Sequence, residues 1–263
     1  MPSEFIPGSG PADSGERQPP GEGVNTHKES DISVITSLHE AIRRRPGMYF
    51  GAVGERGLHH VVYMVVDDAV NATRNVSNGT VDVRILPDGG IRITDNGPGL
   101  PVTTFTGEFP ETKHPTPIVT LALTRSKLWD TSLDLNYDPF GYSHCFVANG
   151  ASSRMIATVK RDGYTWRQSF AMGEPDAPLQ RLGPTDQTGT SIEFYALPDI
   201  FNTVIYYSFE TLARRLRDIA FLNKGLTTTI TDERPGRPLK SDYVSRTFRY
   251  DRGMVEFPSG QED

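Results

Sequence analysis

The sequence predicts an α+β layer fold, in which strand hairpins are combined with amphipathic helices. Residues 57–75 carry apolar side chains at helical spacing and predict the strongest helix. Residues 80–86 and 90–95 predict two strands around the turn Pro87-Asp-Gly-Gly90. Residues 154–160 and 164–170 alternate across Arg161-Asp162-Gly163, which predicts a second hairpin.

Composition excludes several classes of protein. The 263 residues carry a formal charge of −6, which disfavours a general nucleic-acid-binding surface. A single cysteine excludes an intramolecular disulfide framework. We find no apolar run long enough to span a membrane and no signal-peptide pattern at the N-terminus, so we expect a cytoplasmic protein without membrane contact.

The chain divides into a tail, a domain and a short end. Residues 1–30 are rich in Pro, Gly, Ser and charge, and we expect them to be disordered. Residues 31–257 form the expected domain, and residues 258–263 a C-terminal tail. The domain opens with a helix from Asp31, which the arginines 43–45 close and Pro46-Gly47 stops.

The helix over 57–75 has two distinct faces. Its wide apolar face consists of Leu58, Val61, Val62, Val65, Val66, Ala69 and Val70. A second, mostly polar stripe holds Met64, Asp67, Asp68 and Asn71. The two adjacent aspartates are either a metal or ligand site or a pair of solvated carboxylates.

The remaining elements follow in order. Residues 102–115 are irregular, Ile118–Leu123 begins a helix, and residues 124–145 show no clear periodicity. Thr188-Gly-Thr190 leads into a strand, Ser191–Ala196. A helix over 205–222, capped by Gly225, precedes a strand, Thr227–Thr231, and a hairpin-like tail. The apolar face of that helix consists of Phe209, Leu212, Leu216, Ile219 and Phe221.

The stretch from Ile91 to Pro101 is the strongest candidate site. Asp95 ends an alternating strand, Gly97 and Gly99 let the backbone turn and admit a close neighbour, and Pro101 stiffens the exit. A carboxylate above such a Gly-x-Gly floor can accept a hydrogen bond from an exocyclic amine. Alone, the stretch fits equally a strand followed by an Asn-Gly turn.

The motifs together resemble one family. They are Arg45-Pro-Gly-Met-Tyr49, Gly57-Leu-His-His60, Val65-Val-Asp67, Thr94-Asp-Asn-Gly-Pro-Gly-Leu-Pro101, Thr188-Gly-Thr190 and Leu212-Ala-Arg-Arg-Leu-Arg-Asp-Ile-Ala-Phe-Leu-Asn223. In this order, over residues 31–257, the chain resembles the N-terminal ATPase domain of DNA gyrase B and topoisomerase IV subunits, in the GHKL (Bergerat-fold) superfamily. The resemblance implies a two-layer sandwich with a mixed, mostly antiparallel eight-stranded sheet, helices on one face, and a ligand between the layers.

The resemblance implies an intact adenine end. Asp95 matches the aspartate that accepts the adenine amine, and Gly97 and Gly99 match the glycines beneath the base. Thr190 matches a threonine of the same water network. Arg161 matches an arginine at the pocket mouth, where aminocoumarin inhibitors bind.

The resemblance also implies a degenerate phosphate end. Met64 replaces the glutamate that serves as general base, a function worth about 10²–10⁴-fold in rate. Asp68 replaces the asparagine that holds Mg²⁺, and Ala72 replaces an acidic residue. The glycine-rich lid reads Asp138-Pro-Phe-Gly-Tyr-Ser-His144, with Gly141 its one glycine, and Pro98 replaces an arginine. We therefore expect neither ATP nor Mg²⁺ as a cofactor, and no bound metal.

Two features of the family that serve partner contacts are not expected. No tyrosine precedes Tyr49, so an N-terminal arm would lack the aromatic that reaches a partner's nucleotide. The matched region corresponds to the first domain only, so we expect no transducer, metal-binding or DNA-cleavage region and no topoisomerase activity from this chain alone.

We therefore expect a pocket rebuilt to bind a largely apolar small molecule, for example in self-protection against a gyrase-directed antibiotic. Its expected lining includes Met64, Asp68, Asp95, Gly97, Gly99, Pro101, Leu128, Trp129, Phe140, Tyr142, Arg161 and Thr190. The alternative is an enzyme of secondary metabolism that cyclises or isomerises a substrate by proximity. Its candidate acid–base groups are Asp95, Asp68, His60, Tyr142, His144 and Cys145, although His144 and Cys145 would point to opposite faces of one strand. Residual ATP hydrolysis and regulation by pairing with gyrase B are weaker alternatives. The chain itself would be a monomer or a homodimer.

Overall fold

A single large sheet organises the part of the chain that the computed structural model describes, residues 38–105, 115–124, 144–202, 205–235 and 244–252. Its strands run in the order β11-β10-β1-β2-β9-β5-β6-β7, with β8 beside β6. The pair β1–β10 is parallel, and every other pair in this sheet is antiparallel. The prediction of a mixed, mostly antiparallel sheet of about eight strands is confirmed.

The strands of this sheet come from three parts of the chain. They are β1 (Thr80–Ile85), β2 (Ile91–Asp95), β5 (Ser152–Arg161), β6 (Tyr164–Ala171), β7 (Glu174–Pro175), β8 (Gln180–Pro184), β9 (Gly189–Ala196), β10 (Thr227–Asp232) and β11 (Val244–Arg249). Asp162 and Gly163 join β5 to β6 with φ of 55° and 79°, the left-handed pair that a tight hairpin turn requires. Two further short strands, β3 (Thr104–Phe105) and β4 (Thr116–Pro117), pair with each other within the stretch predicted to be irregular.

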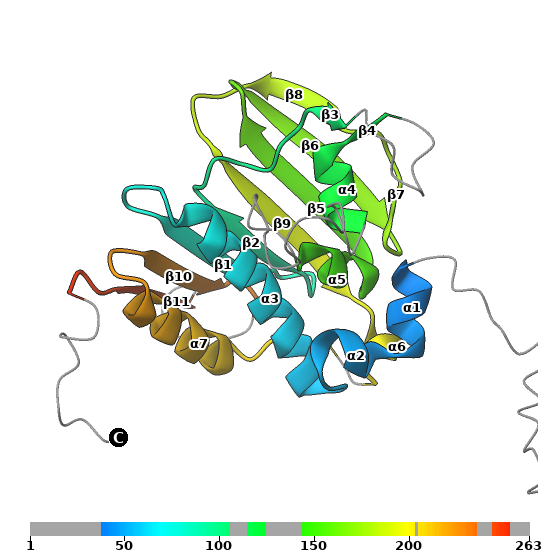
Figure 1. The fold of residues 1–263 in the computed structure, drawn as a ribbon. Coiled ribbons are helices and arrows are strands. Elements are labelled where there is room, and N and C mark those ends of the chain that lie inside the picture. Colours follow the sequence, from blue (N-terminus) through cyan, green and yellow to red (C-terminus); the bar gives the residue numbers. More distant parts are fainter. Residues whose placement is uncertain (1–37, 106–114, 125–143, 203–204, 236–243, 253–263) are drawn as a thin grey trace, which may run out of the picture. The chain divides into compact units, whose positions relative to one another are not determined.

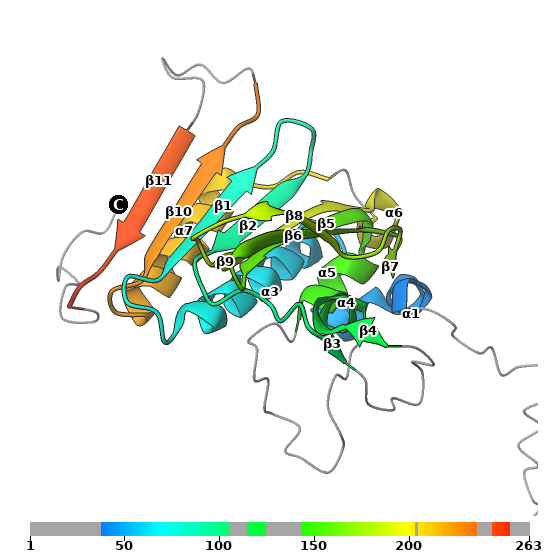
Figure 2. The same ribbon diagram turned by 90° about the horizontal axis from the view of Figure 1, so that it is seen from above.

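Helices cover one face of the sheet, as the view from above in Figure 2 shows. They are α1 (Leu38–Arg44), α2 (Pro46–Phe50), α3 (Glu55–Thr73), α4 (Ile118–Thr124), α5 (Cys145–Gly150), α6 (Pro198–Phe201) and α7 (Phe209–Leu222). The long helix α3 lies across the middle of the layer (Figure 1), and every residue of its predicted apolar face is buried. That face packs against β1 and β2 and joins the helical layer to the sheet through hydrophobic contacts.

The structure corrects five local predictions. Pro46 stops the first helix as expected, but it also begins α2, since proline is well suited to a first helical turn. Helix α7 begins at Phe209 rather than residue 205, because the Ser208 hydroxyl caps it by accepting a hydrogen bond from the Thr211 amide. It ends at Leu222 as predicted, but its C-cap residue is Asn223 rather than Gly225. Phe221 is only half-buried, against the Tyr250 ring.

The fifth correction concerns His144 and Cys145. The sequence argument placed them on one strand, where neighbours point to opposite faces. Cys145 instead begins helix α5, and His144 occupies its N-cap position. Since successive residues at a helix start are not on opposite faces, the argument against their acting together was wrong.

Several predicted residues lie outside the described part of the chain. These are the two tails, Leu128, Trp129, and the lid residues from Asp138 to Tyr142. Predictions about them remain predictions. Within the described residues, no helix is both long and apolar enough to cross a membrane.

Candidate functional site

The Asp95 side chain stands at the end of β2 and is almost fully buried. Its Oδ1 accepts hydrogen bonds from the amide of Gly97, at 2.8 Å, and from the amide of Thr190, at 3.3 Å. The Thr190 hydroxyl accepts a hydrogen bond from the Leu100 amide at 3.1 Å. Backbone groups from the loop after β2 and from β9 therefore fix this carboxylate.

Three glycines let the backbone close around Asp95. A Cβ on Gly97 would lie 2.8 Å from the Ala72 carbonyl oxygen of α3. Gly99 has a φ of +77°, and a Cβ there would lie 2.8 Å from the Lys160 carbonyl oxygen. At Gly189, with φ of +137°, a Cβ would lie 2.1 Å from the Asp95 carbonyl oxygen. The glycines are therefore required by close packing of one backbone on another.

The Arg161 side chain closes the same corner from the end of β5. Its guanidinium donates a 2.5 Å hydrogen bond to the Gly99 carbonyl oxygen. Pro101, also predicted in the lining, is buried behind this loop. The structure thus brings together Asp95, Gly97, Gly99, Arg161 and Thr190, which the sequence placed in one pocket. We call this group the Asp95 corner.

Asp68 lies on α3, one turn before Ala72, and therefore on the helix stripe that leads away from the Asp95 corner. Its side chain is 0% exposed, so the prediction of a solvated carboxylate is wrong for this residue. The His144 amide donates a 2.8 Å hydrogen bond to Oδ2, and the His144 Nδ1 lies 2.9 Å from Oδ1. Asp68 thus caps the start of helix α5 from outside that helix.

Burial raises the pKa of Asp68 above its ordinary value, and hydrogen bonds from His144 and Cys145 oppose part of that rise. Cys145 itself is buried, whereas the His144 side chain is 46% exposed. Asp68, His144 and Cys145 therefore meet around one carboxylate. We call them the Asp68 cluster.

Met64 and Asp67 belong to the same predicted stripe of α3, but their surroundings differ. Met64 is half-buried and packs against the hydrophobic core. Asp67 faces outward and forms an ion pair with Arg215 of α7, with nitrogen and oxygen 3.2 Å apart. The two adjacent aspartates thus have separate roles. Among the described residues, no group of three or more His, Cys, Asp or Glu side chains is arranged so that it could hold a metal ion.

His60, which the sequence analysis proposed as an acid–base group, and its neighbour His59 both lie near the start of α3, and neither is bonded to Asp95 or Asp68. His60 is exposed, and its ring lies near Tyr63. His59 is buried, with Nδ1 2.9 Å from the Glu55 carbonyl oxygen, and its Nε2 accepts a 2.9 Å hydrogen bond from the Ser208 amide. Burial lowers the pKa of His59. The neutral ring joins α3 to the start of α7, a contact that no local sequence pattern could have indicated.

Comparisons with known proteins identify relatives over most of the chain. It is 40% identical over 251 residues to the DNA gyrase B protein of Streptomyces coelicolor, covering 90% of this chain and 35% of that protein. It is 40% identical over 254 residues to the novobiocin-resistant DNA gyrase B protein of Streptomyces niveus, covering 92% of this chain and 36% of that protein. The DNA gyrase B protein of Mycobacterium tuberculosis is 38% identical over 256 residues, and the match covers 87% of this chain and 36% of that protein.

The chain thus spans about a third of the length of these curated relatives. No protein-family model matches the chain. The mixed, mostly antiparallel sheet and the helical layer agree with the fold that the motifs implied. The chain is therefore a DNA gyrase B ATPase-domain-like protein.

Proposed function

We propose that this chain is a catalytically degenerate gyrase B ATPase-like domain whose former nucleotide pocket binds a largely apolar small molecule without hydrolysing ATP. The Asp95 corner would hold a flat hydrogen-bonding group, since its carboxylate, glycines and Arg161 are fixed by backbone contacts. Met64 would supply apolar contact surface where the family has its general base.

The observation that carries this proposal is the state of Asp68. Both of its carboxylate oxygens are bonded to His144, and the side chain is fully buried. A magnesium ligand needs an oxygen that can reach the ion and its waters. The described residues therefore suit the adenine end of a nucleotide and do not suit Mg²⁺ at the family position, so we derive no reaction step through that ion.

Hydrolysis of ATP is the first measurement. We expect phosphate release with saturating ATP and Mg²⁺ to stay at the buffer rate, and Met64→Glu alone not to restore it, because Asp68 remains engaged. Asp95→Asn should weaken any ligand held by the Asp95 corner. It therefore serves as the control that separates hydrolysis by this protein from hydrolysis by a contaminating ATPase. Release that is clearly above buffer and that Asp95→Asn abolishes would overturn the proposal.

Binding of an aminocoumarin is the second measurement. Two relatives from Streptomyces niveus are named as novobiocin-resistant and novobiocin-sensitive gyrase B proteins, which supports novobiocin as a probe and self-protection as the biological role. Calorimetry should show binding that Arg161→Ala and Asp95→Asn both weaken, with Asp186→Asn, a substitution of an exposed residue, as the matched control. The absence of heat at high novobiocin concentration would end the self-protection role.

One observation favours a second candidate, an acid–base enzyme. A buried aspartate beside Nδ1 of a half-exposed histidine is the arrangement that orients an imidazole for proton transfer. Once a ligand of the pocket is found, mass spectrometry after incubation distinguishes the two candidates. A binding module returns the ligand intact, whereas an enzyme converts it and loses that conversion in His144→Gln.

A further inference from the structure

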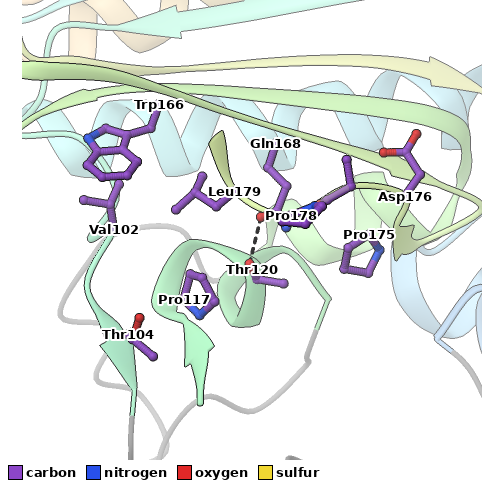
Figure 3. A pocket seen from close by; sticks show the side chains of 11 residues that line it. Val102, Thr104, Pro117, Thr120, Trp166, Gln168, Pro175, Asp176, Pro178 and Leu179 are labelled. Atoms are coloured by element: carbon purple, nitrogen blue, oxygen red, sulfur yellow. Dashed lines mark hydrogen bonds between the residues drawn. The ribbon is translucent and has the colours of Figure 1, made fainter. Parts of the chain in front are cut away.

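Charge distinguishes two pockets that lie apart from the Asp95 corner and the Asp68 cluster. The first, beside α4 and β6, has a volume of about 600 Å³ and a mostly apolar lining (Figure 3). Asp176 is the one charged residue in its described lining, and its carboxylate accepts a hydrogen bond from the Ser169 hydroxyl. Ser169 lies on the face of β6 opposite to Trp166 and Gln168, so that carboxylate is not available to an occupant of this pocket.

The second pocket has a volume of about 400 Å³ and lies where α3 and α7 both end. Sheet register brings its walls together, since β1 and β10 are parallel and both begin here, at Thr80 and Thr227. Strand β11 is antiparallel to β10 and therefore ends here, with Arg249 opposite Thr227. The lining thus comes from three segments distant in sequence, which are residues 70–79, residues 223–226 and Arg249.

Three cations line this second pocket, and its described lining contains no acidic residue. They are Arg74 after the end of α3, Lys224 just after α7, and Arg249 at the end of β11. Arg74 and Lys224 are exposed, and neither side chain has a hydrogen bond or an ion pair with another described residue. A chain with a formal charge of −6 has therefore placed three positive charges around one hollow.

The Arg249 guanidinium is held in position by its neighbours. Its Nη2 donates a 3.3 Å hydrogen bond to Asn78 Oδ1, its Nη1 donates one of 3.3 Å to the Thr227 hydroxyl, and its Nε donates one of 2.8 Å to Asp251 Oδ1. A guanidinium carries five N–H donors, so two of them stay available to an occupant. The Asp251 carboxylate is largely exposed and offsets one positive charge at most.

Cations at such a place ordinarily balance helix dipoles. A helix C-terminus carries roughly half a negative charge, and the ends of both α3 and α7 lie at this pocket. Together with Asp251, these two ends balance about two of the three positive charges. An excess of about one positive charge remains, and it favours an anionic occupant over a neutral or cationic one.

We propose that this pocket binds a small phosphomonoester, with the phosphate held by Arg74, Lys224 and Arg249. A phosphate dianion can pair with several cations at once, and the planar arginine fork matches its oxygens better than a single ammonium does. The volume admits a small organic group beside the phosphate, and Val76 and Leu226 supply apolar surface for that group. The overall charge of −6 disfavours a long polyanion such as nucleic acid. The proposal does not depend on what the Asp95 corner binds.

Phosphorus NMR of phenyl phosphate tests the proposal. We expect the protein to broaden the phosphorus resonance, inorganic phosphate to compete, benzoate to compete more weakly, and benzyl alcohol not to compete. Arg74→Gln and Lys224→Gln should each weaken binding by roughly twofold to fivefold, because each removes one partly exposed charge contact. Arg214→Gln is the matched control, since it removes an exposed arginine of α7 that is outside the lining.

The double variant Arg74→Gln with Lys224→Gln separates this pocket from the former phosphate end of the nucleotide site. We expect it to bind phenyl phosphate more weakly than either single variant does, whereas undiminished binding would place the phosphate elsewhere and overturn the proposal. The absence of broadening, equal effects of the Arg74, Lys224 and Arg214 substitutions, or equal competition by benzoate and phosphate would also overturn it. All three substituted side chains are exposed, so the variants test binding without a risk of unfolding.

Discussion

Asp95 and Asp68 are both buried carboxylates, but their hydrogen-bond donors differ in kind. Asp95 is held by two main-chain amides, of Gly97 and Thr190, within a backbone that glycines allow to close. Asp68 is held mainly by His144, through its amide and its ring, with Cys145 beside it. The first carboxylate is positioned by the sheet, whereas the second depends on side chains and on the start of a short helix.

This difference shows how two ends of one ancestral site can diverge. Backbone donors cannot be removed by substituting their own side chains, so the Asp95 corner tolerates change only where a Cβ fits. Side-chain donors can be exchanged one residue at a time.

The largest expected effect tests whether the backbone fixes the Asp95 corner. Gly189→Ala places a Cβ 2.1 Å from the Asp95 carbonyl oxygen, so we expect a loss of about 3 kcal/mol or more in the free energy of unfolding by urea. Gly225→Ala, at a φ of +79° with no atom within 4 Å, is the control and should cost about 1 kcal/mol. Equal losses would mean that close packing at Gly189 is unimportant.

A smaller effect is expected at the Asp68 cluster. His144→Ala leaves a buried carboxylate without its ring partner while the amide contact remains, so we expect a loss of about 1–3 kcal/mol in the free energy of unfolding. His60→Ala, at an exposed site on α3, should change stability by no more than about 0.5 kcal/mol. If the two variants are equally stable, His144 does not support Asp68.

The pH dependence of the free energy of unfolding should also show the effect of burying Asp68. Its folded-state pKa is raised by burial, so its contribution is fully present below the unfolded pKa and is lost as pH rises through the folded pKa. Relative to Asp68→Asn, the unmodified protein should therefore lose stability as pH rises from about 4 towards neutrality. Urea denaturation across that range measures the difference, and a difference that is constant or of opposite sign would contradict the burial argument.

The smallest effect on stability is expected at Asp67, the residue that precedes Asp68. Asp67→Asn breaks a half-exposed ion pair with Arg215, so we expect a change of about 0.2–1 kcal/mol that shrinks in high salt. The adjacent Asp68→Asn should differ both in size and in pH dependence. If Asp67→Asn proves as costly as His144→Ala, the assignment of separate roles to the two aspartates is wrong.

The strand pairs and helices with clear periodicity were predictable, because alternation and helical spacing reflect which face of each element is buried. Thus α3, the β1–β2 turn and the β5–β6 hairpin were all located correctly. The start of α7 was misplaced because the Ser208 cap, a single hydrogen bond, decides it. The roles of His59 and His144 were not predictable, since their partners lie 149 and 76 residues away in the sequence.

The sequence by itself determined the layered fold and the residue types of the Asp95 corner. These depend on residue type and local spacing, which a linear pattern records. Only the tertiary structure decided that Asp68 is buried against His144 and that Asp67 pairs with Arg215. Each of those contacts joins elements distant in sequence, and the free energy of burial depends on what packs against a side chain rather than on its neighbours along the chain.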